Sequence, residues 1–302
     1  MHLVEAKVAR VSAPRDENRS LAMRLYTLRE ELRASWRALG AKIHPDPVFV
    51  LGTQKSGTSA IASLLAIAAE LEASIDLRRD LDRPRAAEVA TGRRAFGGFL
   101  RRNAVDFSRP IVKEPNLTFL LPEILGRWPQ ARIVFVDRDP VQTVRSVLDR
   151  LEIPGDLEGL EHLDAATAAS IPAGWRIVLD SRWCERHAPG GEVGRPRRHY
   201  VEELARRSLL SRRIAEACAH ARPDRTHVVS YEAFRQGKAG TIERLLEALG
   251  LPMRVERGEF AQHLDRPFQP PGRFATATPE SFFGANLERL RRAAGLAGEV
   301  ES

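Results

Sequence analysis

The fold is decided by Pro47-Val-Phe-Val-Leu-Gly-Thr-Gln-Lys-Ser-Gly-Thr-Ser-Ala-Ile-Ala62. Four apolar residues lead into Gly52 and a short polar loop that contains Gly57, and apolar residues then recur at helical spacing up to Leu71. This pattern predicts a buried strand, a tight loop and a helix. Because such a loop turns backbone N–H groups inward, in front of a helix N-terminus, it favours binding of a phosphate.

The loop also supplies its own positive charge and hydroxyl groups. Lys55 adds a cation, and Thr58 and Ser59 add hydroxyl donors. Gly52 and Gly57 have the separation of the nucleotide-triphosphatase loop G-x-x-x-x-G-K-[ST], but Thr58 stands where that pattern has its lysine. A lysine inside the loop would approach a phosphate from a different side.

Composition places the 302-residue chain among soluble globular proteins, with 43% hydrophobic and 29% charged residues. Its net charge of +7 favours an anionic partner, such as a nucleotide donor, an acidic acceptor or nucleic acid. The two cysteines, Cys184 and Cys218, show no metal-ligand spacing and fit a reducing compartment. The N-terminus has no apolar run of signal or membrane-spanning type. We therefore expect a cytoplasmic protein with no membrane span.

Apolar strands alternate with helical patterns along the chain, which predicts an α/β fold with a central parallel sheet and helices on both faces. We expect a single domain over residues 1–302, with an amphipathic N-terminal helical extension over 1–40 and a largely irregular insertion over 151–198. We expect this extension to pack on the body of the domain, with a homodimer contact as the alternative. Further strands are predicted at 110–113, 132–136 and 226–231. Helices are predicted from the loop to near Ser74, near 85–102 within an otherwise irregular 75–109, from Pro140 onward, and at 117–125, 200–221, 242–249 and 279–294.

A second anion-binding pattern follows a buried strand, in Asp137-Arg-Asp-Pro-Val-Gln-Thr-Val-Arg-Ser146. Arg138 leaves the end of the strand, and Ser146 lies eight residues further on, about two turns into the next helix. A guanidinium fork and a hydroxyl at this separation suit one phosphate.

Together these stretches resemble the sulfotransferases that use 3′-phosphoadenosine-5′-phosphosulfate (PAPS). Residues 54–59 resemble the family's P-K-S-G-T-T loop, with Gln54 in place of the proline and Ser59 in place of the second threonine; Ala60 replaces the tryptophan that commonly follows. Arg138 and Ser146 resemble its 3′-phosphate motif. Residues 110–148 are similar to the bacterial pattern of K-x-P, helix, strand and R-D-P, and residues 229–252 are similar to Y-E-x-L…L-G-L-P. The matches occur in family order and imply a P-loop-like sulfotransferase architecture.

The resemblance implies transfer of a sulfuryl group from PAPS to a hydroxyl or amine acceptor, with adenosine 3′,5′-bisphosphate as the product and no metal. It implies that the loop binds the 5′-phosphosulfate, that Tyr231 lies near the adenine, and that a late basic loop closes the 3′-phosphate site. For that loop we prefer Arg273 to Arg266. The donor-binding residues implied are Lys55, Ser56, Gly57, Thr58, Ser59, Arg138, Ser146, Tyr231 and Arg273.

The catalytic residues that the resemblance implies are Lys55, Asp76 and Lys113. Lys113 matches the K-x-P lysine, but the histidine that often follows it in the family is absent. Some branches use a carboxylate some twenty residues after the loop lysine, which points to Asp76 as the general base. Asp80 and Glu114 are the alternatives.

The acceptor class stays open among a small molecule, a glycan, a lipid and a peptide, and nucleic acid is not expected. The insertion at 151–198 would cover the acceptor, and it contains His162 and His187, for which surface roles are expected.

Two other functions compete with this interpretation. A P-loop Mg²⁺-dependent kinase or phosphotransferase would use Asp137, at the end of its strand, as a metal ligand. The loop lacks the lysine of that pattern, and the adjacent Arg138 would compete for the carboxylate. A basic protein that only binds polyanions would cluster basic and aromatic residues on one face, whereas the arginines here are spread over nearly every segment.

Overall fold

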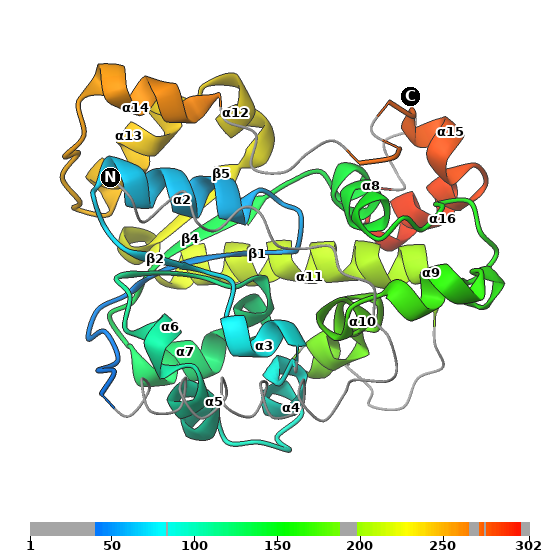
Figure 1. Cartoon of the computed structure of the whole chain (residues 1–302), viewed down its shortest axis with the longest axis horizontal. Helices are drawn as coiled ribbons and strands as arrows, with labels where there is room; N and C mark the ends of the chain where they lie inside the picture. Colours follow the sequence, from blue (N-terminus) through cyan, green and yellow to red (C-terminus); the bar gives the residue numbers. More distant parts are fainter. Residues whose placement is uncertain (1–39, 83, 188–197, 266–271, 275, 297–302) are drawn as a thin grey trace, which may run out of the picture.

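A computed structural model describes residues 40–82, 84–187, 198–265, 272–274 and 276–296. Its centre is a five-stranded sheet with the order β2-β3-β1-β4-β5, in which every neighbouring pair is parallel (Figure 1). The strands are β1 (Val48–Gly52), β2 (Ala73–Ile75), β3 (Ile111–Lys113), β4 (Arg132–Asp137) and β5 (Thr226–Ser230). The predicted α/β fold with a central parallel sheet is confirmed.

The central strand β1 lies between β3 and β4. Gly52 pairs with Val136 on β4, and Val50 pairs with Lys113 on β3. The segments that follow these three strands therefore leave the sheet at one edge. Ligands of open α/β sheets bind outside this carboxyl edge, where the chain changes direction across the sheet.

Helices cover both faces of the sheet (Figure 1). Side chains alternate along β1, so that Val48 and Val50 join one apolar cluster while Phe49 and Leu51 join the other. The first cluster packs under α2 (Thr58–Ala68), α12 (Tyr231–Gln236), α13 (Lys238–Ala248) and α14 (Arg257–Leu264). The second packs against α4 (Ala86–Ala90), α5 (Phe96–Arg102), α6 (Ala104–Phe107), the 3₁₀ helix η2 (Pro115–Leu120), α7 (Leu121–Arg127) and α11 (Tyr200–Ala221).

A third apolar cluster lies beside the sheet and holds the helices at the right of Figure 1 together. It joins the start of α11 to α8 (Pro140–Arg150), α10 (Ala173–Leu179), α15 (Pro279–Phe283) and α16 (Asn286–Ala293). At the start of α8 the Asp139 carboxylate accepts a hydrogen bond from the Gln142 amide at 2.8 Å. The described part of the 151–198 insertion also contains η3 (Leu160–His162), α9 (Ala165–Ser170) and η4 (Ser181–His187), so it is more helical than predicted.

Several predicted boundaries are wrong. The helix after the loop ends at Ala68 rather than near Ser74, and Ser74 lies in β2, a strand too short to show an alternating pattern. Tyr231 begins α12 instead of ending β5. The last predicted helix is two helices, because Gly284 takes a φ of 50° between them. Residues 75–109 hold four short helices: α3 (Arg78–Asp82) and α4 to α6.

The N-terminal extension predicted for residues 1–40 lies outside the described residues, apart from Gly40. Within the part of the chain that the structure describes, no helix combines the length and the apolar character that crossing a bilayer needs.

Candidate active site

The loop between β1 and α2 has the backbone of an anion site. Gly52, Lys55 and Gly57 have φ values of 142°, 68° and 98°, and Lys55 is one of few non-glycine residues with a positive φ. Gly57 precedes the first residue of α2 and has no side chain to cap it. The first N–H groups of α2 therefore face the loop without a capping side chain.

Hydrogen bonds inside the protein fix this loop. The Ser56 hydroxyl donates to the Thr53 carbonyl at 2.8 Å, and the side chain of Ser56 is 1% exposed. The Thr118 hydroxyl accepts from the Gly52 amide and donates to the Gly52 carbonyl, both at 2.8 Å. The Ser56 backbone amide also donates to the Thr53 carbonyl, at 3.2 Å, so both polar donors of Ser56 support the loop backbone.

The electrostatic environment of Lys55 favours an anion. Burial, followed by the charges of Arg150 and Arg138, lowers the pKa of Lys55 to about 8. Asp149 acts in the opposite direction. Since these cations repel one another, binding an anion among them would relieve the repulsion.

Arg138 and Tyr231 lie directly against the loop. The Arg138 Nη1 atom donates to the Lys55 carbonyl oxygen at 2.6 Å. The Arg138 guanidinium also lies 4.7 Å from the centre of the Tyr231 ring. A Cβ atom on Gly57 would come within 3.0 Å of two carbons of this ring, so Tyr231 packs on the glycine face of the loop. Ser146 lies further along α8 and is partly exposed.

A second group of predicted residues meets at the ends of β2 and β3. Lys113 is 4% exposed and forms an ion pair with Asp76. The Glu114 carboxylate accepts from the Leu77 and Asn116 amides at 3.3 and 3.0 Å. Burial, together with the charge of Asp76, raises the pKa of Glu114 to about 7. Glu114 therefore caps η2, and Asp76, whose side chain is 34% exposed, is the more accessible carboxylate.

Asp80, the other alternative base, caps a helix. It is 4% exposed, and its Oδ2 atom accepts from the Arg85 and Ala86 amides at 3.1 and 3.3 Å. Burial raises its pKa. These contacts hold the start of α4 and leave Asp80 poorly placed to reach an acceptor.

The late loop is held against α8. The Phe274 amide donates to Asp149 Oδ1 at 2.7 Å, and Arg145 Nη2 donates to the Phe274 carbonyl at 2.9 Å. Arg273 is exposed, with its guanidinium 5.4 Å from the Phe274 ring centre. No contact between Arg273 and the Lys55 loop is found among the described residues, and Arg266 lies outside them.

The remaining residues that the sequence singled out lie apart from this group. His162 is exposed, with Glu158 and Glu161 at 3.9 Å. His187 ends η4, and its side chain is outside what the structure describes. The Asp137 carboxylate accepts from Arg212 Nε at 3.1 and 3.2 Å, so it is already paired with a cation.

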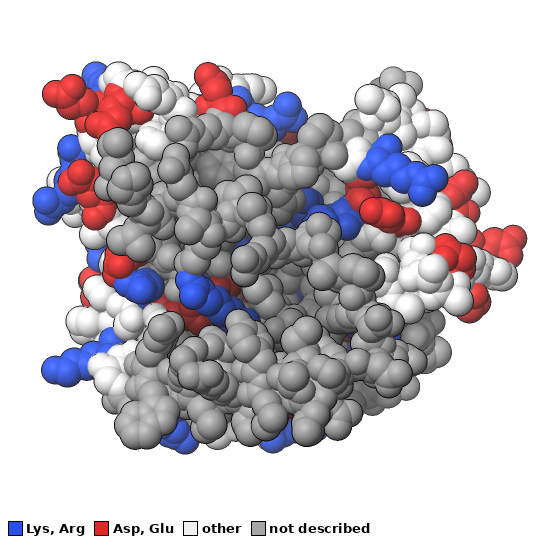
Figure 2. All heavy atoms as spheres, in the orientation of Figure 1, with Lys and Arg blue, Asp and Glu red and all other residues white. Residues whose placement is uncertain are grey.

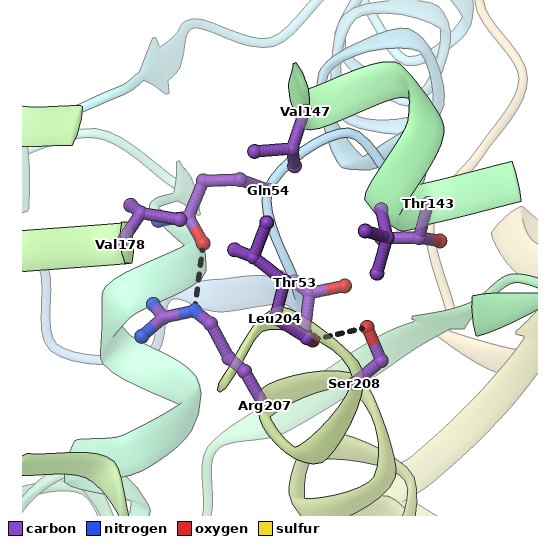
Figure 3. Close-up of a pocket in the computed structure, with 9 residues that line it drawn as sticks. Thr53, Gln54, Thr143, Val147, Val178, Leu204, Arg207 and Ser208 are labelled. Atoms are coloured by element: carbon purple, nitrogen blue, oxygen red, sulfur yellow. Dashed lines mark hydrogen bonds between the residues drawn. The ribbon is translucent and has the colours of Figure 1, made fainter. Parts of the chain in front are cut away.

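One buried residue of the site was missed by the sequence analysis. Arg207 of α11 is 2% exposed and contacts Gln54, beside a small recess behind the loop (Figure 3). The recess is lined by Thr53, Gln54, Thr143, Val144, Val147, Val178, Leu204, Arg207 and Ser208. Arg207 follows Leu204 by three residues on the buried stripe of α11. A charged residue on an otherwise buried stripe was the signal in the sequence.

No protein-family model and no curated protein matches the chain. Solved sulfotransferase structures align over most of it. Sulfotransferase STF9 from Mycobacterium avium is 13% identical, with 92% of this chain and 83% of that chain covered and a TM-score of 0.49. STF1 from Mycobacterium tuberculosis H37Rv is 16% identical. The alignment covers 91% of this chain and 85% of STF1, with a TM-score of 0.48. Retinol dehydratase, solved with androsterone and the inactive cofactor PAP, is 18% identical. The alignment covers 90% of this chain and 76% of the retinol dehydratase chain, with a TM-score of 0.39. The likeness is distant, so residue roles must be inferred from this chain's own geometry.

Proposed function

We propose that the protein is a sulfotransferase that moves a sulfuryl group from PAPS to a hydroxyl or amine acceptor and releases adenosine 3′,5′-bisphosphate. The observation that carries this proposal is the contact between the two predicted anion sites. Arg138 donates a 2.6 Å hydrogen bond to the Lys55 carbonyl, so both cations lie at one edge of the sheet. A nucleotide with phosphates at both its 5′ and 3′ ends needs two such sites within the reach of one molecule.

The loop residues suit the 5′ end of the donor. Lys55, the amides from Gly57 to Ser59 and the Thr58 hydroxyl would bind the phosphosulfate in front of α2, while the Ser56 amide supports the loop. Arg138 and Ser146 would bind the 3′-phosphate, with Arg273 as a further cation. Tyr231 packs on Gly57 and Arg138, which supports a place for its ring beside the adenine.

In the proposed transfer step, the acceptor loses a proton and the 5′-phosphate of the donor leaves. The Asp76 carboxylate takes the proton from the acceptor as the acceptor oxygen or nitrogen forms its bond to sulfur. The bond from sulfur to the 5′-phosphate oxygen breaks, and its electron pair stays on that oxygen. Lys55 and the loop amides stabilise the charge that develops there, a role typically worth about 10²–10³ in rate for one donor. Lys113 orients Asp76 through their ion pair.

The phosphotransferase alternative is weakened by the environment of Asp137. That alternative needs this carboxylate as a metal ligand, whereas Arg212 Nε lies 3.1 Å from it. For the polyanion-binding alternative, charge distribution is the relevant observation. On the face shown in Figure 2, basic and acidic side chains are interspersed among the described residues and do not form one basic stripe.

The deciding experiment is thermal unfolding of the full chain with different ligands. Adenosine 3′,5′-bisphosphate without metal should raise the midpoint, and ATP with Mg²⁺ should raise it less. A larger response to ATP with Mg²⁺ would contradict the proposal, and a response to neither would favour the polyanion-binding function. In a second step, Lys55→Ala should lose most turnover with PAPS.

Four further features remain predictions: a small-molecule, glycan or lipid acceptor, a cytoplasmic location, a single domain and a homodimer.

A further inference from the structure

A buried polar cluster is centred on Arg207, and Figure 3 shows the hydrogen bond from Arg207 to Gln54. Arg207 Nε donates to Gln54 Oε1 at 3.1 Å, and Nη2 donates to Asn116 Oδ1 at 2.7 Å. Nη1 donates to Cys184 Sγ at 2.7 Å. Each nitrogen of the guanidinium therefore has a partner, and the partners come from three separate segments of the chain.

The charge of Arg207 is held in an unusual way. Among the described residues, no carboxylate forms a hydrogen bond to this guanidinium. Its partners are two amide oxygens and a thiol, and its planar group lies over the rings of Phe119 and Trp183 at 4.3 and 5.2 Å. Burying an ionised group is costly, and an apolar side chain of similar volume would fill such a space at lower cost. Packing alone therefore does not account for an arginine at this position.

We propose that Arg207 is a positioning residue that fixes the conformation of the Lys55 loop through Gln54. Gln54 immediately precedes Lys55, whose φ of 68° is unfavourable for a residue with a side chain. Both ends of the Gln54 amide are held, because Oε1 accepts from Arg207 and Nε2 donates to Asn116 Oδ1 at 2.9 Å. The loop cannot relax at Lys55 without straining these bonds.

The same cluster links the loop to the second half of the site. The backbone amide of Asn116 donates to the Glu114 carboxylate at 3.0 Å, and Glu114 follows Lys113 directly in the chain. Arg207 thus ties the phosphate loop to the segment that holds the Lys113–Asp76 ion pair. The anchoring of the loop follows from the contacts alone, whereas its effect on nucleotide affinity rests on the proposed function.

The test compares Arg207→Met, Gln54→Ala and the double variant with an Arg206→Met control, since Arg206 is the exposed neighbour on the same helix. Hydrogen exchange of the 53–58 amides in the unliganded full chain is the first measurement. Each single variant should exchange roughly tenfold faster at these amides, and the double variant should be no faster than the singles, because both singles remove the Arg207–Gln54 bond that is proposed to fix the loop. Gln54→Glu should keep part of the protection, since its carboxylate still accepts from Arg207.

The second measurement is the affinity for adenosine 3′,5′-bisphosphate, which we expect to fall roughly tenfold in both single variants and to stay unchanged in the control. Unchanged loop exchange in a folded Gln54→Ala variant, or additive effects in the double variant, would overturn the inference. If Arg207→Met fails to fold, Gln54→Ala still decides, because its side chain is only partly buried. Failure of the proposed function looks different: the unmodified protein would not bind the nucleotide, while loop exchange would still report the anchor.

Discussion

Replacing Gly57 with alanine tests whether the loop acts through its backbone. Gly57 has a φ of 98°, and an added Cβ atom would overlap the Tyr231 ring. A residue with a side chain costs about 1–2 kcal/mol in a left-handed conformation. Displacing Tyr231 from its 4.7 Å contact with Arg138 would cost about 1 kcal/mol more.

The sum of about 2–3 kcal/mol corresponds to a roughly 30- to 150-fold change in an equilibrium constant. The loop of the variant can avoid this strain by relaxing into another conformation. Ligand binding must then restore the strained conformation, so the same free energy is subtracted from the free energy of binding. We therefore expect Gly57→Ala to bind adenosine 3′,5′-bisphosphate more weakly by about that factor, as measured by titration calorimetry. The protein should remain folded, since a cost of about 2–3 kcal/mol is smaller than the roughly 5–15 kcal/mol by which native proteins are typically stable.

The matched control is Gly126→Ala in α7, where an added Cβ atom meets nothing within 4 Å and φ is not positive. Its affinity should equal that of the unmodified protein. A second comparison sets Gly57→Ala with Tyr231→Ala against Tyr231→Ala alone. The double variant has no overlap but keeps the backbone cost, so it should still bind the nucleotide more weakly than Tyr231→Ala. Unchanged nucleotide affinity in Gly57→Ala would refute the reasoning, because the loop would then bind without its left-handed backbone.

Three other predictions concern charge. Nucleotide affinity should weaken as the pH rises above 8, because the pKa of Lys55 is about 8 and deprotonation removes its positive charge. Lys55→Arg should not show this loss of affinity, since arginine stays charged. Asp76→Asn should lower kcat by about 10²–10⁴ with little change in nucleotide affinity, whereas Glu72→Gln on the surface should change neither; equal kcat values would remove Asp76 as the base. Arg273→Ala removes the exposed cation of the late loop and should weaken binding of adenosine 3′,5′-bisphosphate about fivefold but not that of AMP. An equal loss for both nucleotides would argue against a 3′-phosphate role for Arg273.

The parts of the fold that the sequence predicted well are those with a local cause. Strand β1 alternates between two apolar clusters, and the glycines of the loop mark the places where φ becomes positive. At α8 the Asp139 cap and the following proline specify where the helix begins. Strand β2 was missed because three residues carry no readable period, and its place at the edge depends on pairing with β3.

The pairings within the site depend on tertiary structure and were beyond the sequence. Asp76 and Lys113 were both selected from motif spacing, but their ion pair results from the register that sets Ile75 beside Lys113. Likewise, Glu114 has the residue type of a base, yet its backbone contacts show that it caps a helix. Arg207 lies 153 positions from Gln54 in the chain, so no local pattern could join them.

In the Lys55 loop, the groups that hold the backbone conformation are different from the group that supplies the positive charge. Gly52 is held through its backbone groups by Thr118, and Ser56 bonds to the Thr53 carbonyl within the loop, so these contacts hold the backbone without using the charge of Lys55. Lys55 carries the charge, and its lowered pKa reflects a position that burial and neighbouring cations make unfavourable until an anion is present. Since Arg138 already bonds to the Lys55 carbonyl, the two cationic sites are linked before any ligand binds. A loop with this arrangement would need little reorganisation to bind the doubly phosphorylated nucleotide that we propose, which is the condition under which fixed donors stabilise a developing charge most effectively.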